Sequence, residues 1–387
     1  MAEIELIATA TFGLEAVVAR EVRALGYDDV KVENARVTFK ADTRAICRAN
    51  LWLRSADRVL VKMGEFPAYS FAELFEKTKA LPWPDWLPEK ASFPVEGKSI
   101  RSKLFSVPDC QAIVKKAIVE SMKKKYRRQW FEETGPRYTI EVALLKDMAT
   151  LTIDTSGPGL HKRGYRKLSG AAPLKETLAA AMIQLSRWQP DRVLIDPFCG
   201  SGTIPIEAAL IGLNLAPGLQ REFAAEKWPN ISSKLWQEAR QEARDLARRD
   251  QTLQIRGTDI DHRVLGMARY HGRLAGVDKY IHWQQQPVSE LRARQKYGYI
   301  ICNPPYGERL EDRAAVENLY REMGRVFGNL DTWSFYVLTS HPRFEKLFGR
   351  RADKNRKLYN GRIQCYYYQF FGPRPPRQKR NSNDSSS

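Results

Sequence analysis

The chain has 387 residues, more than one usual domain, and 43% of them are hydrophobic, so we expect two or three folded domains with buried cores. Lys and Arg outnumber Asp and Glu by 63 to 45, and the formal net charge of +18 indicates a polyanionic partner, most often nucleic acid. The five cysteines lie far apart, without a CxxC or a Cys/His cluster. This spacing argues against a zinc site or a disulfide framework and fits a reducing cytoplasm.

Two further classes of protein are disfavoured by the sequence. Its first residues include Glu3 and Glu5 instead of the basic region of a signal peptide. The longest apolar stretch, near residues 193–217, is interrupted by Asp196, Glu207, proline and glycine, so it is not expected to form a transmembrane helix. We therefore expect a cytoplasmic protein that needs neither a membrane nor a metal.

Residues 1–56 are predicted to form a small ferredoxin-like α+β unit. A strand at 3–9 is followed by a helix for which Thr11 is the candidate N-cap. Two short strands and a helix that starts near Asp42 come next. The order strand, helix, strand, strand, helix is typical of such a unit.

Residues 57–155 form a second mixed α+β region. Its longest helix, near 108–127, ends in a cluster of Lys and Arg with few acidic residues. A solvated helical face is one interpretation, but charges of one sign repel each other, and a bound anion would relieve this repulsion. We therefore favour an RNA-facing surface, and its predicted contacts are Lys123, Lys124, Lys125, Arg127 and Arg128.

The remaining chain is predicted to contain a linker, a large α/β domain and a tail. Residues 156–172 are rich in glycine and basic residues, and Arg163 and Arg166 within this linker are candidate RNA contacts between two domains. Residues 173–372 alternate between helices and strands, which is typical of a doubly wound, mainly parallel sheet. The Asn360-Gly361 pair predicts a final antiparallel hairpin. Residues 373–387 are expected to be a disordered tail.

A glycine turn follows the first buried strand of the α/β domain. Residues 196–203 lead through Gly200 and Gly202 into a helix, and glycines there let the backbone approach a ligand closely. A tight turn would explain the glycines alone, and the pattern is neither GxGxxG nor a Walker A loop. The next strand ends in a second acidic site. There we expect Asp259 to accept the hydroxyls of a ribose and Asp261 to cap a helix.

A second turn, Asn303-Pro304-Pro305-Tyr306, leaves another buried strand, and we call it the NPPY turn. The prolines fix the backbone, so the Asn303 amide oxygen and the Pro304 carbonyl oxygen are two acceptors held close together. They could hold both N–H groups of a planar base amine and direct its lone pair at a methyl donor, which is catalysis by position and electrostatics. Tyr306 could stack on a base that has been swung out of its helix. A simple strand-ending turn is the competing interpretation.

Residues 196–203, Asp259 and the NPPY turn together resemble class I S-adenosylmethionine-dependent methyltransferases that act on base amines. Over about residues 1–372 the chain is similar to a subgroup with a ferredoxin-like unit, an RNA-binding THUMP domain and a Rossmann-like methyltransferase domain. Residues 159–166, 173–181 and 303–310 resemble the bacterial large-subunit rRNA guanine-N2 methyltransferases of that subgroup. The resemblance implies that residues 57–155 are the THUMP domain and 173–372 the methyltransferase domain.

The resemblance also implies the residues of the site. S-adenosylmethionine is expected to contact Asp196, Phe198, Gly200, Gly202, Thr203, Asp259, Ile260 and Asn303. The expected catalytic residues are Asn303, Pro304 and Tyr306, of which the first two hold the guanine N2 amine. The family usually has an acidic residue near the adenine after its third strand. This chain has Gln-Gln-Gln-Pro at 284–287, and Gln286 is the candidate substitute.

The leading hypothesis is therefore a guanine-N2 methyltransferase of 23S-type large-subunit rRNA. The NPPY turn would also serve a guanine in tRNA, or the N6 amine of adenine in DNA or RNA; the basic N-terminal half favours RNA but does not separate rRNA from tRNA. A noncatalytic RNA-binding ribosome-assembly factor is a third hypothesis, against which the intact NPPY turn and glycine turn argue. A nicotinamide dehydrogenase is disfavoured because no GxGxxG follows a strand.

Overall fold

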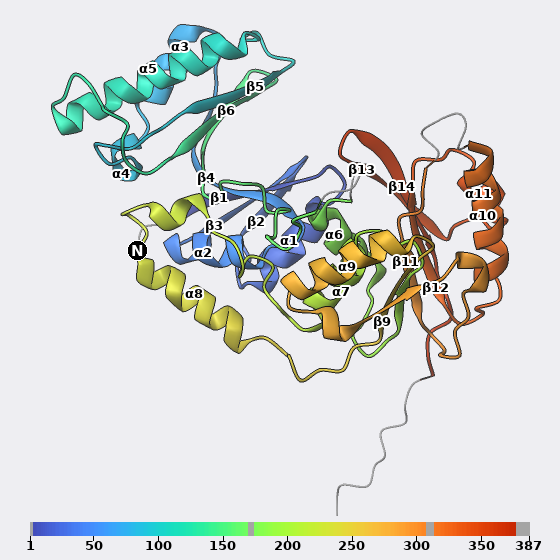
Figure 1. The fold of residues 1–387 in the computed structure, drawn as a ribbon. Helices are drawn as coiled ribbons and strands as arrows, with labels where there is room; N and C mark the ends of the chain where they lie inside the picture. The colour runs from blue at the N-terminus through green and yellow to red at the C-terminus, as the bar shows by residue number, and fades with distance from the viewer. Residues whose placement is uncertain (1–2, 169–173, 307–312, 377–387) are drawn as a thin grey trace, which may run out of the picture. The chain divides into compact units, whose positions relative to one another are not determined.

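A computed structural model describes residues 3–168, 174–306 and 313–376. The chain forms two compact units, and most of its helices and strands are labelled in Figure 1. The N-terminal unit contains Met1–Lys167, Lys175–Ala181 and Leu213–Arg249, and the C-terminal unit contains Leu168–Leu174, Met182–Gly212 and Asp250–Ser387. In the described ranges no helix combines the length and the apolar character that crossing a membrane requires.

One seven-stranded sheet with the order β2-β3-β1-β4-β7-β6-β5 forms the centre of the N-terminal unit. The strands are β1 (Ile4–Ala10), β2 (Val30–Glu33), β3 (Arg36–Ala41), β4 (Ala56–Pro67), β5 (Val95–Ile100), β6 (Thr139–Leu145) and β7 (Met148–Asp154). Residues 56–61 of β4 pair with β1, and residues 60–67 pair with β7. Because β4 is long enough to pair with both, the two regions predicted at 1–56 and 57–155 share one continuous sheet.

The helices of the N-terminal unit are α1 (Glu15–Ala24), α2 (Thr43–Trp52), α3 (Phe71–Lys79), α4 (Trp83–Trp86), α5 (Val107–Tyr126) and α8 (Ser233–Asp245), and α6 (Glu176–Ser186) begins here and ends in the C-terminal unit. The helices predicted after Thr11, from near Asp42 and near 108–127 form as α1, α2 and α5. Asp42 caps α2 by accepting the Ala45 N–H at 3.2 Å. The cap expected at Thr11 is wrong, because the Thr11 hydroxyl donates to Asp57 at 3.2 Å and α1 starts only at Glu15.

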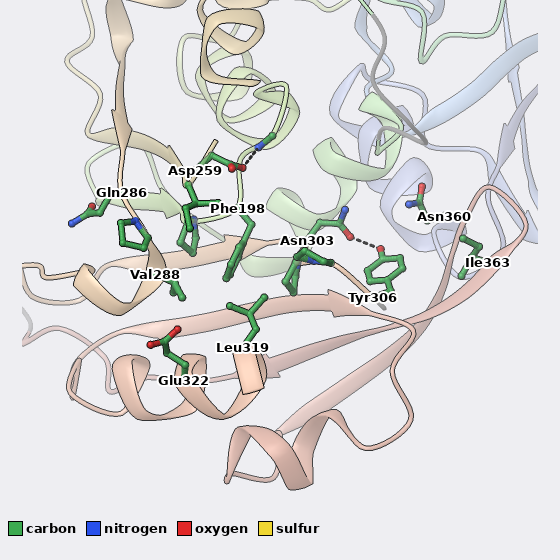
Figure 2. Close-up of a pocket in the computed structure, with 16 residues that line it drawn as sticks. Phe198, Asp259, Gln286, Val288, Asn303, Tyr306, Leu319, Glu322, Asn360 and Ile363 are labelled. Carbon is green, nitrogen blue, oxygen red and sulfur yellow. Dashed lines mark hydrogen bonds between the residues drawn. The ribbon is translucent and has the colours of Figure 1, made fainter. Parts of the chain in front are cut away.

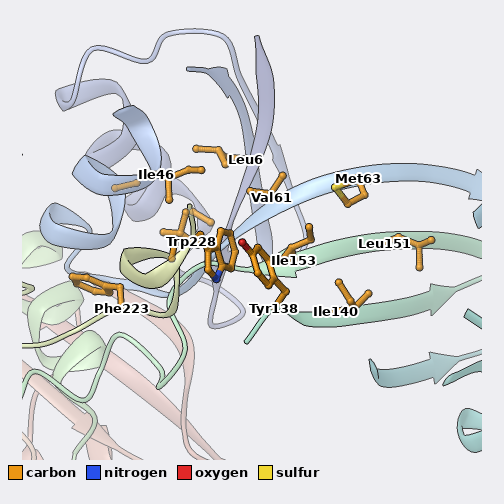
Figure 3. Close-up of a cluster of buried hydrophobic side chains, with 14 of the residues drawn as sticks. Leu6, Ile46, Val61, Met63, Tyr138, Ile140, Leu151, Ile153, Phe223 and Trp228 are labelled. Atoms are coloured by element: carbon orange, nitrogen blue, oxygen red, sulfur yellow. The ribbon is translucent and has the colours of Figure 1, made fainter. Parts of the chain in front are cut away.

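Residues 213–249 pack with the N-terminal unit, although they lie within the sequence of the predicted methyltransferase domain. The Trp228 ring stacks on Tyr138 with the ring centres 4.3 Å apart, and the Trp228 indole N–H donates to the Arg137 carbonyl at 3.0 Å (Figure 3). Glu242 of α8 accepts hydrogen bonds from the Arg48 guanidinium at 2.8, 3.0 and 3.2 Å. This insertion therefore completes the hydrophobic core beneath the N-terminal sheet.

The C-terminal unit contains a second seven-stranded sheet with the order β10-β9-β8-β11-β12-β14-β13. Its strands are β8 (Leu194–Asp196), β9 (Ile255–Asp259), β10 (Ile281–Gln285), β11 (Tyr299–Cys302), β12 (Ser334–Thr339), β13 (Lys354–Asn360) and β14 (Ile363–Phe370). The first five in the sheet order are parallel, and β14 is antiparallel to both of its neighbours, β12 and β13. Its helices are α7 (Thr203–Gly212), α9 (His262–Leu274), α10 (Arg313–Phe327) and α11 (Phe344–Phe348). The predicted Rossmann-like α/β class is confirmed.

The final hairpin forms as predicted, but its two-residue loop is Gly361-Arg362 and not Asn360-Gly361. Asn360 is the last residue of β13 and pairs with Ile363. Gly361 has a φ of +62°, and a glycine with positive φ suits the first position of a two-residue hairpin loop. The shift leaves the Asn360 side chain on the strand, where it contributes to the site described below.

Candidate active site

A cavity of about 550 Å³ lies at the carboxyl ends of the parallel strands in the C-terminal unit (Figure 2). Each of four strands supplies wall residues at or just after its carboxyl end: Phe198 and Gly200 for β8, Asp259 and Ile260 for β9, Gln286 and Pro287 for β10, and residues 303–306 for β11. The carboxyl ends of parallel strands are the usual place for a ligand in this class of fold. Two motifs that lie about a hundred residues apart in the sequence therefore face one cavity.

Asp259 is fixed to the glycine turn. One of its carboxylate oxygens accepts the Gly200 N–H at 3.0 Å, and the other accepts the Asp261 N–H at 3.0 Å. Gly200 has a φ of +50°, and a Cβ atom added to it would meet no atom within 4 Å, so its backbone faces open space. Asp261 accepts the Arg263 N–H at 2.8 Å and caps α9, as predicted. Asp261 therefore caps the helix, and Asp259 lines the cavity.

Asp196, Gly202 and Thr203 are buried and are not part of the cavity wall. Asp196 is 1% exposed, and its carboxylate accepts the Phe198 N–H at 3.1 Å. Burial raises the pKa of Asp196 well above its usual value, the Phe198 N–H opposes this shift, and the nearby charge of Asp259 adds to it. A Cβ atom at Gly202 would lie 2.9 Å from the Trp283 ring, so this position requires glycine for packing as well as for its φ of +88°.

The NPPY turn forms the opposite end of the cavity. The Tyr306 hydroxyl donates a hydrogen bond to the Asn303 amide oxygen, and Figure 2 shows this pair beside Asn360 and Ile363 of the hairpin. Burial raises the pKa of Tyr306, so its hydroxyl stays protonated and remains a donor. Among the described residues no group donates to the Pro304 carbonyl. One of the two predicted acceptors is thus open, and the other is occupied by a tyrosine hydroxyl.

Gln286 occupies the end of the cavity away from the NPPY turn. Its backbone N–H donates to the Asp259 carbonyl at 3.0 Å, and its side-chain NH₂ donates to the Glu290 carbonyl at 3.0 Å. The Gln286 amide oxygen is buried and accepts no hydrogen bond from any residue in the described part of the chain. An unsatisfied buried acceptor in a cavity wall suits a ligand that brings an N–H donor.

Five wall residues lie outside the predicted motifs: Val288, Leu319, Glu322, Asn360 and Ile363. Leu319 and Glu322 lie one helical turn apart on α10, and their place in the wall depends on how that helix packs on the sheet. No local motif in the sequence marks them. A sequence argument could have found Asn360 only by recognising that the hairpin loop starts one residue later.

The predicted basic surface at the end of α5 is largely ion-paired. Salt bridges join Lys123 to Glu120 at 2.8 Å, Lys125 to Asp85 at 3.6 Å and Arg128 to Glu89 at 2.7 Å. Lys124 and Arg127 are exposed and have no acidic partner in the described part of the chain. Trp130 follows them and is 82% exposed, which the charge pattern did not predict.

The two RNA contacts predicted in the linker, Arg163 and Arg166, bind groups of the protein itself. Arg163 is 3% exposed, and its guanidinium donates to the backbone carbonyls of Leu160 and Arg54. Arg166 lies 3.5 Å from the buried Glu176 carboxylate. The Arg163 guanidinium satisfies two buried backbone carbonyls, and the Arg166 guanidinium forms an ion pair with a buried carboxylate, all within the N-terminal unit. The basic composition of the linker did not reveal this, because burial depends on tertiary packing.

Three known families match successive parts of the chain. The RlmL ferredoxin-like domain matches residues 5–60, the THUMP domain matches residues 68–154, and the RMKL-like methyltransferase domain matches residues 163–369. A relative in Bacillus subtilis (strain 168), named "Putative RNA methyltransferase YpsC", is 54% identical over 385 residues, which cover 99% of this chain and 100% of that protein.

Solved structures of relatives have the same fold over nearly the whole chain. A crystal structure described as a predicted N6-adenine-specific DNA methylase from Listeria monocytogenes is 56% identical, with a TM-score of 0.93, and covers 96% of this chain and 97% of its own. SMU.472, described as "a putative methyltransferase complexed with SAH", is 47% identical, with a TM-score of 0.92, and covers 97% of this chain and 100% of its own. The chain therefore belongs to the RMKL-like methyltransferase family and is a THUMP-containing RNA methyltransferase that uses S-adenosylmethionine.

Proposed function

We propose that the protein methylates the exocyclic N2 amine of a guanine in 23S-type large-subunit rRNA. The main support for an amine as the methyl acceptor is the NPPY turn. Its Asn303 amide oxygen and Pro304 carbonyl lie at one end of the cavity. The resemblance of residues 159–166, 173–181 and 303–310 to the bacterial rRNA guanine-N2 enzymes supports guanine and rRNA.

The other end of the cavity fits S-adenosylmethionine. The Asp259 carboxylate suits ribose hydroxyls, the open backbone at Gly200 allows a close approach, and the unsatisfied Gln286 oxygen suits the amine of an adenine. When bound, this cofactor supplies an electrophilic methyl group. Of the other predicted residues, we assign Phe198 and Ile260 to apolar contacts with it, because both line the wall, whereas Asp196, Gly202 and Thr203 do not.

Asn303, Pro304 and Tyr306 are assigned to the acceptor base. The Asn303 amide oxygen and the Pro304 carbonyl accept the two N–H groups of the amine, which keeps the nitrogen lone pair free and directed into the cavity. Both acceptors are neutral, so the amine is activated by position and not by a strong base. To reach this position, the base amine displaces the Tyr306 hydroxyl from Asn303, and the tyrosine ring becomes available for stacking.

RNA binding is assigned to the THUMP domain. Lys124 and Arg127 are the exposed cations of the α5 end without an acidic partner in the described ranges, and the exposed Trp130 follows them in the sequence. Unpaired cations next to an exposed aromatic ring suit phosphates and unstacked bases.

An adenine N6 amine is the second candidate, because the Listeria relative is described as N6-adenine-specific. The deciding experiment incubates the purified protein with labelled S-adenosylmethionine and, separately, undermethylated rRNA, tRNA and DNA, followed by mass analysis of the nucleosides. N2-methylguanosine in rRNA alone is the expected product. N6-methyladenosine, or a product only in tRNA or DNA, would replace the proposal, and no product with any substrate would contradict it.

A further inference from the structure

We propose that Tyr320 is a positioning residue for the NPPY turn: its buried hydroxyl, held by Thr339, fixes the Pro305 carbonyl and thereby the acceptor end of the cavity. Tyr320 does not line the cavity and would act only through this turn. The role in turnover rests on the proposed function, whereas the role in ordering the turn does not.

The hydrogen-bond directions follow from the groups involved. A carbonyl oxygen can only accept, so the single Tyr320 O–H proton is donated to Pro305, at 2.7 Å. At the contact of 2.8 Å with Thr339, the Tyr320 oxygen must therefore be the acceptor and the Thr339 hydroxyl the donor. The Thr339 oxygen in turn accepts the His341 N–H at 3.1 Å. A chain of three hydrogen bonds thus runs from the end of β12 to the turn.

This chain lies in the core of the C-terminal unit. Tyr320 and Thr339 are both 0% exposed, so water does not compete for their hydroxyls. The Tyr320 ring packs edge-to-face against His341 and Phe344, with ring centres 5.5 and 5.1 Å apart. Packing on these sides leaves the ring little freedom to turn, so the hydroxyl is held in one place.

The NPPY turn depends on such an anchor because of its own sequence. Pro304 and Pro305 have no N–H, so the middle of the turn can be tied to the rest of the unit only through carbonyl groups. The Pro305 carbonyl, next to the Pro304 carbonyl that we assign to the amine, is the one that Tyr320 holds. A displacement of about 1 Å in a reacting geometry can cost about 100-fold in rate, so loss of the anchor is expected to reduce turnover.

The test replaces the hydroxyl and keeps the ring. Tyr320→Phe should lower kcat by about 10- to 100-fold while the Kd for S-adenosylmethionine changes by less than about threefold. Tyr336 and Tyr367 provide matched controls, because their buried hydroxyls also donate to backbone carbonyls, of Ser186 at 3.0 Å and of Met182 at 2.8 Å. Tyr336→Phe and Tyr367→Phe should leave kcat within about threefold of the unaltered protein, since they lose an equivalent bond at another place.

Thr339 allows a second, independent variant. Thr339→Val removes the hydroxyl that orients Tyr320 and should lower kcat in the same direction as Tyr320→Phe, whereas Thr339→Ser keeps the hydroxyl and should restore it. If kcat falls equally in Tyr320→Phe and in the two control variants, the hydroxyl acts through general stability and the positioning role is overturned. Equal activity of Thr339→Val and the unaltered protein would overturn the part assigned to Thr339.

A measurement without turnover separates this proposal from the proposed reaction. Hydrogen–deuterium exchange at the Asn303 and Tyr306 amides should become faster in Tyr320→Phe than in Tyr336→Phe or Tyr367→Phe. Faster exchange in a protein that methylates no guanine would support the anchor and contradict only the reaction. Unchanged exchange in Tyr320→Phe would contradict the anchor whatever the reaction is.

Discussion

The NPPY turn and the basic end of α5 both present polar groups, but they hold them in different ways. At the turn, the acceptors directly follow strand β11, and a buried tyrosine donates a hydrogen bond to the neighbouring carbonyl. At the end of α5, long side chains reach acidic partners on the surface at Glu120, Asp85 and Glu89. Exposed ion pairs contribute only about 0.2–1 kcal/mol each, so a phosphate could replace them at low cost.

This difference predicts how each region responds to mutation. A group that acts by position loses its effect when a single atom moves, and the loss is large. A group that acts by charge contributes a small, additive and salt-dependent amount. Variants of the NPPY turn should therefore have the largest effects, and variants of the α5 end the smallest.

The largest effect is expected from Asn303→Ala. It removes an acceptor that we assign to the amine, so turnover should fall by at least about 100-fold while the Kd for S-adenosylmethionine changes only a few-fold. Single-turnover methylation and calorimetry measure the two quantities. Asn318→Ala, at an exposed asparagine of α10, is the control. Normal turnover of Asn303→Ala would refute the amine-holding role.

Two variants of Tyr306 distinguish the role of its ring from the role of its hydroxyl. Tyr306→Ala removes the stacking surface and should lower kcat/KM for RNA by about 10- to 100-fold, because stacking contributes about 1–3 kcal/mol per base. Tyr306→Phe keeps the ring and removes only the donor that occupies Asn303, so its KM should not rise. Steady-state kinetics with an RNA substrate measure both. If Phe is as damaging as Ala, the hydroxyl has a role beyond holding the Asn303 acceptor.

Asp196→Asn is expected to change stability and cofactor affinity in opposite directions. Because the folded-state pKa of Asp196 is raised, its protonated form is favoured by folding, and stability is lost as pH rises from the usual Asp range through the folded pKa. The neutral amide avoids this loss, so Asp196→Asn should melt at a higher temperature at about pH 8, and its advantage should shrink at acidic pH. Thermal unfolding at several pH values measures this.

The same variant should bind S-adenosylmethionine more weakly at about pH 8. The cofactor carries positive charge, so it favours the Asp196 carboxylate, and affinity of the unaltered protein should fall as pH is lowered through the raised pKa. Calorimetry across pH tests this, and a pH dependence that survives in Asp196→Asn would assign it to another group.

The smallest effect concerns the α5 end. Replacing Lys124 and Arg127 with Ala should weaken RNA binding and reduce the slope of log K against log salt by about one for each lost phosphate contact. Lys123 and Lys125, which have acidic partners, are the matched pair and should change the slope less. Binding titrations at several salt concentrations compare them. Equal slopes for both double variants would mean that ion pairing does not select the phosphate contacts.

The sequence by itself determined the elements and the order of the motifs. Hydrophobic periodicity located nearly every strand and helix, and the residue types at the two strand ends identified a glycine turn and an amine-binding turn. These properties are local, because helix and strand periods, glycine and proline act within a few residues. The parallel order of the strands then follows from the alternation of helices and strands, and each motif directly follows one of those strands.

Only the tertiary structure decided which residues face the cavity and which do not. Asp196 is buried and is not part of the wall, whereas Glu322 and Asn360 reach it from distant parts of the sequence. Arg163 is occupied by backbone carbonyls, residues 213–249 pack with the N-terminal unit, and Tyr320 meets Pro305 through the core. Each depends on contacts between segments far apart in the chain, which are selected by burial and hydrogen-bond satisfaction and leave no mark in any local pattern.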